Sequence, residues 1–394
     1  MSAYILAPGR EKSLLHRHPW VFSGAIDKIR GDVESGATVE IVAADGRFLG
    51  LAAASPASQI RARIWSFDPG AVIDTGFFEK RLRAAIARRA HLFGDADSSA
   101  RLVHAESDGL PGLIVDRYAD TLVVQILSAG AEHWRDAIFD ALVAITGVAA
   151  VFERSDAEVR TLEALPSRVG PVRGKSVAST TMMEHALRYP IDLAHGQKTG
   201  FFLDQRANRL RIRGLAAGAD MLDCFSYTGG FTLNALQGGA RSVLAIDSSA
   251  VAIQSAERNA HLNGFTPGRT SFIEADAFSH LRLLRDQARS FDLIVLDPPK
   301  FAPTVKHVER AARAYKDINL LALKLLRPGG TLATFSCSGG LGIELFQKIV
   351  AGAAVDARVE VQIGGRLSAA EDHPVSLYFP EGDYLKGLLL RRPA

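Results

Sequence analysis

The sequence has little of several features that would each indicate a particular class of protein. It contains only two cysteines in 394 residues, which excludes a disulfide framework, and no Cys/His cluster has the spacing of a zinc site. No run of about 18 apolar residues occurs, so we expect no transmembrane helix. The N-terminal MSAYILAPGREK also lacks the apolar stretch of a signal peptide. We therefore expect a cytoplasmic protein that binds neither a metal ion nor a membrane.

The net charge is also small, at +3, and says little about binding partners. The distribution of charge is more informative, because ten Lys and Arg residues but only four acidic residues lie between Arg160 and Arg213. A helical stretch, EKRLRAAIARRAH, adds five positive charges. Such segments are typical of a surface that binds a phosphate backbone, and equally of a solvated basic face.

The chain has no internal repeat, and its pattern changes twice, which predicts three domains. Residues 1–72 contain short strands and turns, as in ATVEIVAADGRFLGLAAA. Residues 75–180 combine a helix from about Phe77 to Phe93, three strands and a second, amphipathic helix, and end in the turn-rich LPSRVGPVRGKS. From 181 to 394 strands and helices alternate, which predicts an α/β domain with a mostly parallel, doubly wound sheet.

Polar residues follow the predicted strands of this last domain. The strands end at Asp223, Asp247, Asp276 and Asp297, and a fifth ends at the SCS that contains Cys337. The carboxyl ends of parallel strands are where such sheets bind their ligands. A single Asp at such a position is usually a helix cap, but four at successive strand ends are hard to assign to capping alone.

The first of these turns, DCFSYTGG, indicates a cofactor other than a dinucleotide. It lacks the G-x-G-x-x-G fingerprint and a P-loop lysine. A carboxylate at Asp247 can accept both hydroxyls of a ribose, and one at Asp276 can accept an adenine amine. This combination fits S-adenosylmethionine, whose sulfonium needs no phosphate cradle; NAD is the nearest alternative.

The motif DPPKF, Asp297 to Phe301, is more specific. Its two prolines fix the backbone and lack N–H donors, so Asp297 and the carbonyls of Pro298 and Pro299 can receive the exocyclic amine of a base. Phe301 can stack on that base. The alternative is a stiff turn after a strand, with Phe301 in the core.

Several segments together resemble one enzyme family, the ribosomal RNA large subunit methyltransferase I family. They are DLAHGQKTGFFLDQRANR, LDCFSYTGGF, DLIVLDPPKF, YKDINLLALKLL, TFSCSG and DHPV…FPEGDYLKG. The resemblance implies a bacterial S-adenosylmethionine-dependent enzyme that makes 5-methylcytosine in 23S ribosomal RNA. It also implies an N-terminal RNA-binding PUA β-barrel, to which HRHPWVFSGAI is similar, a small α+β central domain, and a Rossmann-like methyltransferase domain with a seven-stranded, mostly parallel sheet.

The resemblance also implies roles for individual residues. Those that would shape the cofactor pocket are Asp223, Tyr227, Gly229 and Gly230, with Asp247 at the ribose and Asp276 at the adenine. Those that would close over the cofactor are Phe202, Asp204 and Arg206. Asp297 would meet the target cytosine, together with Pro298, Pro299, Lys300 and Phe301, and Cys337 would be the nucleophile.

Chemistry supports the role of Cys337 independently. Carbon 5 of cytosine is a poor nucleophile until a thiolate adds to carbon 6, and strands four and five are expected to be neighbours, about 4.8 Å apart, which places Cys337 beside Asp297. The alternative for Cys337 is a buried structural cysteine, which is our interpretation of Cys224. Many 5-methylcytosine enzymes carry a cysteine after the proline of this motif, whereas Pro299 is followed here by Lys300.

Three questions remain open from the sequence. Asp297 is a candidate for the base that removes the carbon 5 proton only through its proximity, and Lys300 either lowers the pKa of the thiol or contacts a phosphate. An RNA methyltransferase that acts on an amine or a guanine nitrogen, without a covalent intermediate, and an inactive RNA-binding protein are the competing functions. The oligomeric state is open, a homodimer included.

Overall fold

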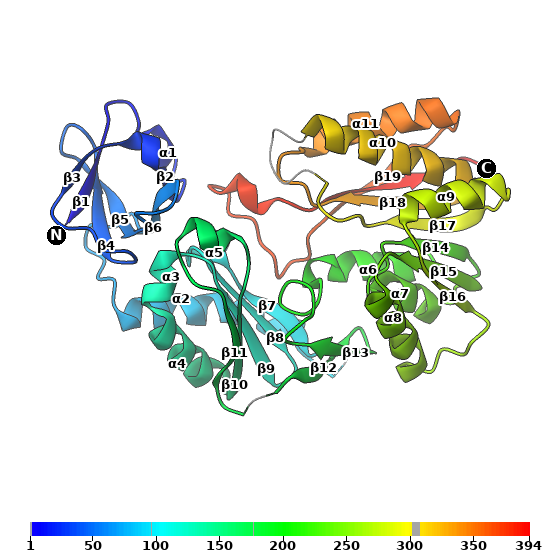
Figure 1. Cartoon of the computed structure of the whole chain (residues 1–394), viewed down its shortest axis with the longest axis horizontal. Coiled ribbons are helices and arrows are strands. Elements are labelled where there is room, and N and C mark those ends of the chain that lie inside the picture. Colours follow the sequence, from blue (N-terminus) through cyan, green and yellow to red (C-terminus); the bar gives the residue numbers. More distant parts are fainter. Residues whose placement is uncertain (1, 96, 176, 302–307) are drawn as a thin grey trace. The chain divides into compact units, whose positions relative to one another are not determined.

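The computed structural model describes residues 2–95, 97–175, 177–301 and 308–394. The chain divides into two compact units, which are coloured along the sequence in Figure 1. The first consists of Met1–Leu203 and Asp372–Gly382, and the second of Asp204–Glu371 and Asp383–Ala394. None of the described helices is both long enough and apolar enough to cross a membrane.

The first unit begins with a six-stranded sheet in the order β2-β6-β5-β4-β1-β3. Its elements are β1 (Ala3–Leu6), α1 (Lys12–Leu15), β2 (Trp20–Phe22), η1 (Ser23–Ala25), β3 (Ile26–Arg30), β4 (Thr38–Val42), β5 (Phe48–Ala54) and β6 (Ile60–Ser66). Neighbouring strands are antiparallel except β1 and β4. Val39 and Ile41 alternate with less buried residues along β4 and enter one apolar core, as the period of a strand requires.

A second sheet follows, with five strands in the order β11-β10-β9-β8-β7. Its elements are α2 (Thr75–Ala87), η2 (Ala90–Leu92), β7 (Ser99–His104), η3 (Ala105–Asp108), β8 (Leu113–Tyr118), β9 (Thr121–Ile126), α3 (Ala129–His133), α4 (Arg135–Thr146), β10 (Ala150–Ser155), α5 (Val159–Leu162) and β11 (Arg168–Arg173). The three strands expected in this block are β7, β8 and β9. The turn-rich segment contains β11 instead of turns alone, because a strand at the edge of a sheet tolerates a proline such as Pro171.

A hairpin joins this unit at a place where the sequence predicted the start of the last domain. It comprises β12 (Ser179–Glu184) and β13 (Leu187–Asp192), which pair antiparallel. Met183 exchanges hydrogen bonds with Ser98, since its carbonyl accepts from the Ser98 N–H at 3.0 Å and its N–H donates to the Ser98 hydroxyl at 2.8 Å. The hairpin therefore groups with the first unit, and the second unit begins at Asp204 and not at residue 181.

The second unit is built on a seven-stranded sheet in the order β16-β15-β14-β17-β18-β20-β19. The strands are β14 (Asp220–Cys224), β15 (Ser242–Asp247), β16 (Thr270–Glu274), β17 (Phe291–Leu296), β18 (Leu326–Ser336), β19 (Gln362–Ser368) and β20 (Lys386–Arg391). All neighbouring pairs from β16 to β18 are parallel, and β20 is antiparallel to both β18 and β19. The predicted seven-stranded, mostly parallel sheet is confirmed. Its strand order reverses between β14 and β17, where doubly wound sheets bind their ligands.

Helices cover both faces of this sheet (Figure 1). They are α6 (Arg206–Arg213), α7 (Gly230–Gln237), α8 (Ala250–Leu262), α9 (Ala277–Asp286), α10 (Val308–Leu325) and α11 (Ile343–Ala357), with short 3-10 helices η4 (Leu203–Gln205) and η6 (Pro380–Gly382) elsewhere in the chain. Leu222 and Cys224 pack with α9, α10 and α11, whereas Met221 packs with α6 and α7. Successive residues of β14 thus face opposite sides, which puts Asp223 on the side of α6 and α7.

Candidate functional site

The register of the sheet brings the predicted strand-end residues to one edge. Cys224 pairs with Ile246 on one side and with Leu296 on the other, and Leu296 pairs with Thr334. The strands β15, β14, β17 and β18 therefore end at nearly the same level. The predicted site residues at this edge are Asp223 and Asp247, within the last two residues of β14 and β15, and Asp297 and Cys337, which directly follow β17 and β18.

The turn after β14 has an unusual backbone. Phe225 and Tyr227 adopt positive φ angles of 63° and 48°, which non-glycine residues rarely do, and Gly229 has a φ of 83°. A Cβ atom on Gly229 would lie 3.0 Å from the Leu233 side chain and 3.2 Å from that of Ala256. The turn thus needs glycine both for its conformation and for the approach of α7 to α8, and such strained turns concentrate at binding sites.

Asp223 is a buried carboxyl group with one oxygen that lacks a hydrogen-bond partner among the described residues. Its side chain is 0% exposed, and the hydroxyl of Thr232 donates to Oδ2 at 2.6 Å. Among the described residues, Oδ1 is buried without a hydrogen-bond partner. Burial raises the pKa of Asp223 to about 7, and the negative charges of Asp297 and Asp247 act in the same direction. A cationic donor placed at Oδ1 would relieve the cost of this buried, unpaired oxygen.

Asp247 and Asp276 both act in the local backbone structure. Asp247 is half-buried, and its two oxygens accept the N–H groups of Ser249 at 2.9 Å and of Tyr227 at 2.8 Å. Asp276 is exposed and caps α9, since its Oδ1 accepts both the N–H of Ser279 at 2.9 Å and the hydroxyl at 2.8 Å. Asp247 therefore holds the turn after β14 in place, whereas the role of Asp276 at an adenine stays a prediction.

A chain of side-chain amides orients Asp297. Gln205 donates from Nε2 to Asp297 Oδ1 at 2.9 Å, and Gln205 in turn accepts from Nδ2 of Asn208 at 2.6 Å. The same Asn208 amide donates to the carbonyl of Ser368 at 2.9 Å. Sequence reasoning did not single out Gln205 or Asn208, although both lie in the segment FFLDQRANR; nothing in their spacing reveals a partner almost a hundred residues away.

The residues of DPPKF differ in exposure. Pro298 is buried, whereas Pro299 and Lys300 are exposed. Phe301 is half-buried, and its ring centroid lies 4.9 Å from that of Tyr315 and 5.9 Å from that of Phe278. This aromatic packing favours the interpretation of Phe301 as a core residue over a stacking platform for a base.

Cys337 lies between two serines that are held by one tyrosine. Its Sγ is 3.9 Å from the carbonyl oxygen of Pro298, so the thiol faces the DPPKF turn on the neighbouring strand. Ser336 donates to the hydroxyl of Tyr315 at 2.9 Å, and that hydroxyl also lies 3.1 Å from Oγ of Ser338. The predicted proximity of Cys337 to the end of β17 is thus observed, and Tyr315, which the sequence did not reveal, orders the SCS segment.

The segment FFLDQR spans the boundary between the two units. Asp204 is buried in the second unit, where Oδ2 accepts from the hydroxyl of Tyr384 at 2.6 Å. Arg206 is the first residue of α6 and is also buried. Phe202 belongs to the first unit, and its ring centroid lies 4.5 Å from Nζ of Lys198. A role for these residues in covering a cofactor stays a prediction.

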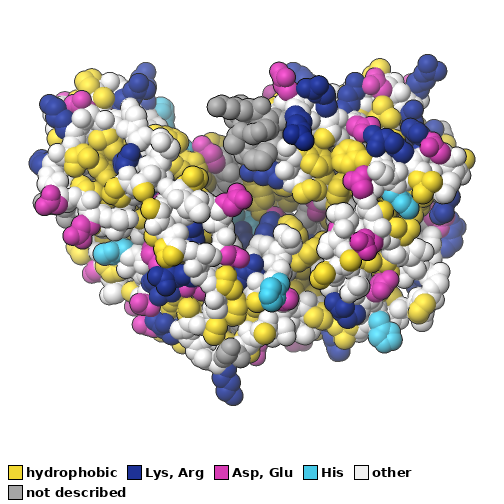
Figure 2. All heavy atoms as spheres, viewed as in Figure 1, with side chains coloured by type: hydrophobic (Ala, Val, Ile, Leu, Met, Phe, Trp, Pro, Cys, Tyr) yellow, Lys and Arg dark blue, Asp and Glu magenta, His cyan; other side chains and the backbone are white. Residues whose placement is uncertain are grey.

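The basic segment between Arg160 and Arg213 is not the continuous surface that its charge suggested. Arg160 is 1% exposed and donates to Glu132 at 3.0 Å and to the carbonyl of Pro166 at 2.9 Å, and Arg206 and Arg209 are buried as well. Charge patterns do not distinguish a guanidinium that pairs inside the fold from one that faces water. On the face shown in Figure 2, Lys and Arg side chains alternate with Asp and Glu.

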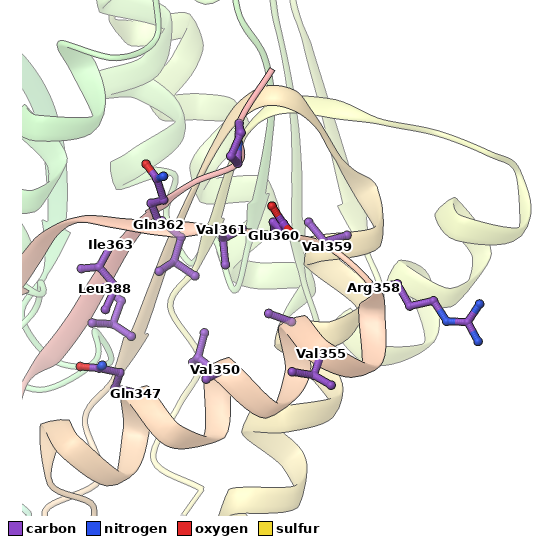
Figure 3. Close-up of a pocket in the computed structure, with 14 residues that line it drawn as sticks. Gln347, Val350, Val355, Arg358, Val359, Glu360, Val361, Gln362, Ile363 and Leu388 are labelled. Atoms are coloured by element: carbon purple, nitrogen blue, oxygen red, sulfur yellow. The ribbon is translucent and has the colours of Figure 1, made fainter.

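A groove with a volume of about 680 Å³ lies away from these residues (Figure 3). It runs between α11 and the strands β19 and β20 and is lined by apolar side chains such as Val350, Val355 and Ile363. None of the predicted site residues lines it, so we place the functional site at the strand ends and not in this groove. Within the described residues, no cluster of three or more His, Cys, Asp or Glu side chains has a geometry suited to a metal ion.

Two families match the chain. Residues 155–364 match the family described as S-adenosylmethionine-dependent methyltransferase, and this range contains every strand end discussed above. Residues 5–67 match the family of PUA-like domains. The first sheet is therefore PUA-like and the second unit is a Rossmann-like methyltransferase fold, as predicted. S-adenosylmethionine is the cofactor that this family uses, and the available oxygen of Asp223 and the glycine turn after β14 fit it.

Relatives that align with nearly the whole chain carry the name of one methyltransferase. Ribosomal RNA large subunit methyltransferase I of Klebsiella pneumoniae (strain 342) is 48% identical over 389 residues, which cover 98% of this chain and 97% of the relative. The protein of the same name from Aeromonas salmonicida (strain A449) is 49% identical over 394 residues, covering 99% and 100%.

Solved structures share the fold over the full length. A Streptococcus mutans protein assigned as an S-adenosylmethionine-dependent methyltransferase has a TM-score of 0.86 at 19% identity, covering 99% of this chain and 100% of that one. A protein assigned as a methyltransferase and solved with S-adenosylhomocysteine has a TM-score of 0.87 at 20% identity, with the same coverage. At this identity they show the fold alone.

Proposed function

Because the chain belongs to the ribosomal RNA large subunit methyltransferase I family, we propose that it methylates carbon 5 of a cytosine in 23S ribosomal RNA. The methyl donor is S-adenosylmethionine, and the nucleophile is Cys337. The observation that carries the choice of carbon 5 is the position of this thiol, 3.9 Å from the Pro298 carbonyl at the end of the adjacent strand. The PUA-like domain supports RNA as the substrate, and with ribosomal RNA as the substrate we propose that the enzyme acts in the cytoplasm.

The ends of β14 and β15 hold the cofactor in this proposal. Bound there, S-adenosylmethionine supplies an electrophilic methyl group on a positively charged sulfur. Oδ1 of Asp223 accepts its ammonium group, because this oxygen is buried and lacks a partner among the described residues. Asp247, whose carboxylate is already oriented by two N–H groups, accepts the ribose hydroxyls. The other residues assigned to the cofactor are Tyr227, Gly229, Gly230, Asp276, Phe202, Asp204 and Arg206.

The reaction begins at Cys337. Its thiolate adds to carbon 6 of the cytosine, and the electron pair of the bond between carbons 5 and 6 shifts into the ring to give an enamine-like species. Carbon 5 is then nucleophilic and would form a bond to the methyl group of the donor, whose bond to sulfur would break with the electron pair left on the sulfur. A base removes the proton from carbon 5, the double bond forms again, and the thiolate leaves carbon 6, so that Cys337 is regenerated.

Asp297 positions the target cytosine during these steps. Its carboxylate accepts the exocyclic amine of cytosine, and Gln205 and Asn208 keep it pointed at the site. As the carboxylate at the end of the strand beside Cys337, Asp297 is also our candidate for the group that removes the carbon 5 proton. The target cytosine has to leave any duplex to reach this edge of the sheet.

The experiment that tests the proposal uses ribosomal RNA carrying 5-fluorocytosine. Fluorine at carbon 5 cannot leave as a proton does, so the adduct between RNA and protein should accumulate in the presence of S-adenosylmethionine. Mass spectrometry should map it to Cys337, and it should be absent from Cys337→Ala but present in Cys224→Ala. Methylated RNA without any adduct, together with an active Cys337→Ala, would instead show an amine or guanine-nitrogen methyltransferase.

A further inference from the structure

Lys386 places a positive charge inside the second unit. It is the first residue of β20, it is 6% exposed, and the residues around it in LKGLLL are buried as well. Its Nζ donates to the carbonyl oxygen of Ser338 at 3.0 Å. An ammonium group taken out of water costs several kcal/mol unless a negative charge or several hydrogen-bond acceptors compensate for it. A neutral carbonyl supplies only part of that compensation.

The position of Lys386 is set by the residues on both sides of Cys337. The register of β18 and β20 pairs Lys386 directly with Ser336, and the side chain reaches on to Ser338. Lys386 therefore spans the SCS segment from one serine to the other. On the face of the sheet that Ser336 and Lys386 share, the hydroxyl of Tyr315 holds the side chains of the same two serines.

The charges that face Lys386 come from three other segments. Burial lowers the pKa of Lys386, negative charges on Asp383 and Cys337 raise it, and the positive charge of Lys300 lowers it. Burial also raises the pKa of Tyr315, and a negative charge on Cys337 adds to that effect. Because the interaction of two charges is mutual, a thiolate that favours the ammonium form of Lys386 is favoured by that ammonium to the same extent.

We propose that Lys386 is a positioning residue for Cys337. The ammonium group of Lys386 stabilises the thiolate of Cys337 and thereby prepares it for addition to carbon 6. The use of that thiolate as a nucleophile rests on the function proposed above, whereas the stabilisation itself is independent of it. Among the described residues, Lys300 is the other cation whose charge acts on Lys386, but it is exposed. Solvent and salt screen an exposed charge much more than a buried one, so Lys386 contributes more than Lys300.

The test is the rate at which iodoacetamide alkylates the thiol between pH 6 and pH 10. In this reaction the thiolate displaces iodide and forms a thioether, so the rate follows the fraction of thiolate. Cys224 is 0% exposed, so modification of the folded protein reports on Cys337, which peptide mass spectrometry confirms. We compare the native chain with Lys386→Met, Lys386→Arg and Lys300→Met. Lys324→Met, at an exposed position of α10, is the matched control.

In Lys386→Met we expect alkylation at pH 7 to slow about tenfold, which corresponds to an upward move of the titration by about one pH unit. Lys386→Arg, which keeps the charge, should stay closer to the native profile than Lys386→Met does, and Lys324→Met should match the native profile. An unchanged profile in Lys386→Met overturns the proposal, and so does a larger change in Lys300→Met than in Lys386→Met.

A reciprocal measurement covers the case in which Lys386→Met does not fold. The Nζ resonance of Lys386, followed by NMR in protein with isotope-labelled lysine, should titrate at lower pH in Cys337→Ala than in the native chain. Equal titration in the two proteins overturns the proposal. The outcomes also separate the two ideas, because an RNA adduct with an unchanged alkylation profile refutes only the role of Lys386. An altered profile without any adduct refutes only the cytosine carbon-5 mechanism.

Discussion

The ends of β14 and β18 each carry a cysteine, and the two thiols have different surroundings. Cys224 is completely buried among the apolar side chains that contact α9, α10 and α11. Burial raises the pKa of the Cys224 thiol well above its usual range, and the charge of Asp223 adds to this. Cys337 is half-buried, packs against the apolar cluster that contains Phe335 on the side of α6 and α7, and faces the carbonyl of Pro298.

The difference shows how one step along a strand decides what a thiol can do. Successive residues of a strand face opposite sides of the sheet, so Asp223 and Cys224 point to different faces. Cys224 turns into the core, whereas Cys337 lies just beyond the last paired residue of its strand, where the backbone opens toward the ligand edge. A buried thiol remains protonated and inert, whereas the half-buried Cys337 keeps the exposure that our proposed nucleophile requires.

The largest effect that would test this comparison is the loss of each thiol in turn. Cys337→Ala should lower the rate of methyl transfer to unmodified ribosomal RNA by at least about 10³-fold, as expected when a nucleophile is removed. Cys224→Ala should keep the rate and lose about 1 kcal/mol of unfolding free energy, because only packing is removed. Radiolabelled methyl transfer and denaturant unfolding measure the two effects. Similar losses of rate in both variants would contradict the comparison.

A smaller effect concerns Asp223, the residue before Cys224, and the way its carboxyl group makes the unfolding free energy depend on pH. The pKa of Asp223 in the folded protein, about 7, lies above the ordinary value of 3.8, so between these pH values the folded protein binds a proton that the unfolded chain has released. The stability from this group is therefore present at low pH and lost as the pH rises through 7. From pH 5 to pH 7 the cofactor-free protein should lose about 2–3 kcal/mol of unfolding free energy from this source.

The variant Asp223→Asn checks the source of this change, because its unfolding free energy should vary less with pH. The affinity for S-adenosylhomocysteine should also fall about tenfold from pH 8 to pH 6 in the native chain, since protonation of Asp223 removes the acceptor for the ammonium group. The same affinity should change little in Asp223→Asn. Calorimetric titration at both pH values measures it, and equal pH dependence in the two proteins would remove Asp223 from the cofactor site.

The smallest effect is expected at Tyr315, which contacts the serines on both sides of Cys337 at the end of β18. Tyr315→Phe removes the hydroxyl that contacts Ser336 and Ser338 while keeping the ring in the core. We expect a loss of about 1–2 kcal/mol in unfolding free energy. The rate of methyl transfer should fall about fivefold, equivalent to about 1 kcal/mol of lost orientation of Cys337. Tyr378→Phe, at an exposed tyrosine, is the control, and a normal rate in Tyr315→Phe would limit Tyr315 to a structural role.

Much of the site was predictable because the pattern of neighbouring residues indicates where each strand ends. Alternation of apolar segments with helical ones predicted the parallel sheet, and in such a sheet the residues after each strand share an edge. The local pattern therefore locates Asp223, Asp247, Asp297 and Cys337 at the same edge. The hairpin β12–β13 groups with the first unit through contacts with Ser98, which join residues distant in sequence and so could not be read from the local pattern.

The sequence by itself determined the periodicity of the elements, the strand ends that carry carboxylates and a thiol, and the membership in a methyltransferase family. These depend on neighbouring residues and on motifs. Only the tertiary structure decided that Gln205 and Asn208 orient Asp297, that Arg160 pairs with Glu132 inside the fold, and that Lys386 donates to the carbonyl of Ser338, the residue after Cys337. The physical reason is that burial and pairing of a charge depend on side chains contributed by other elements, and these are brought together only when the sheet has formed.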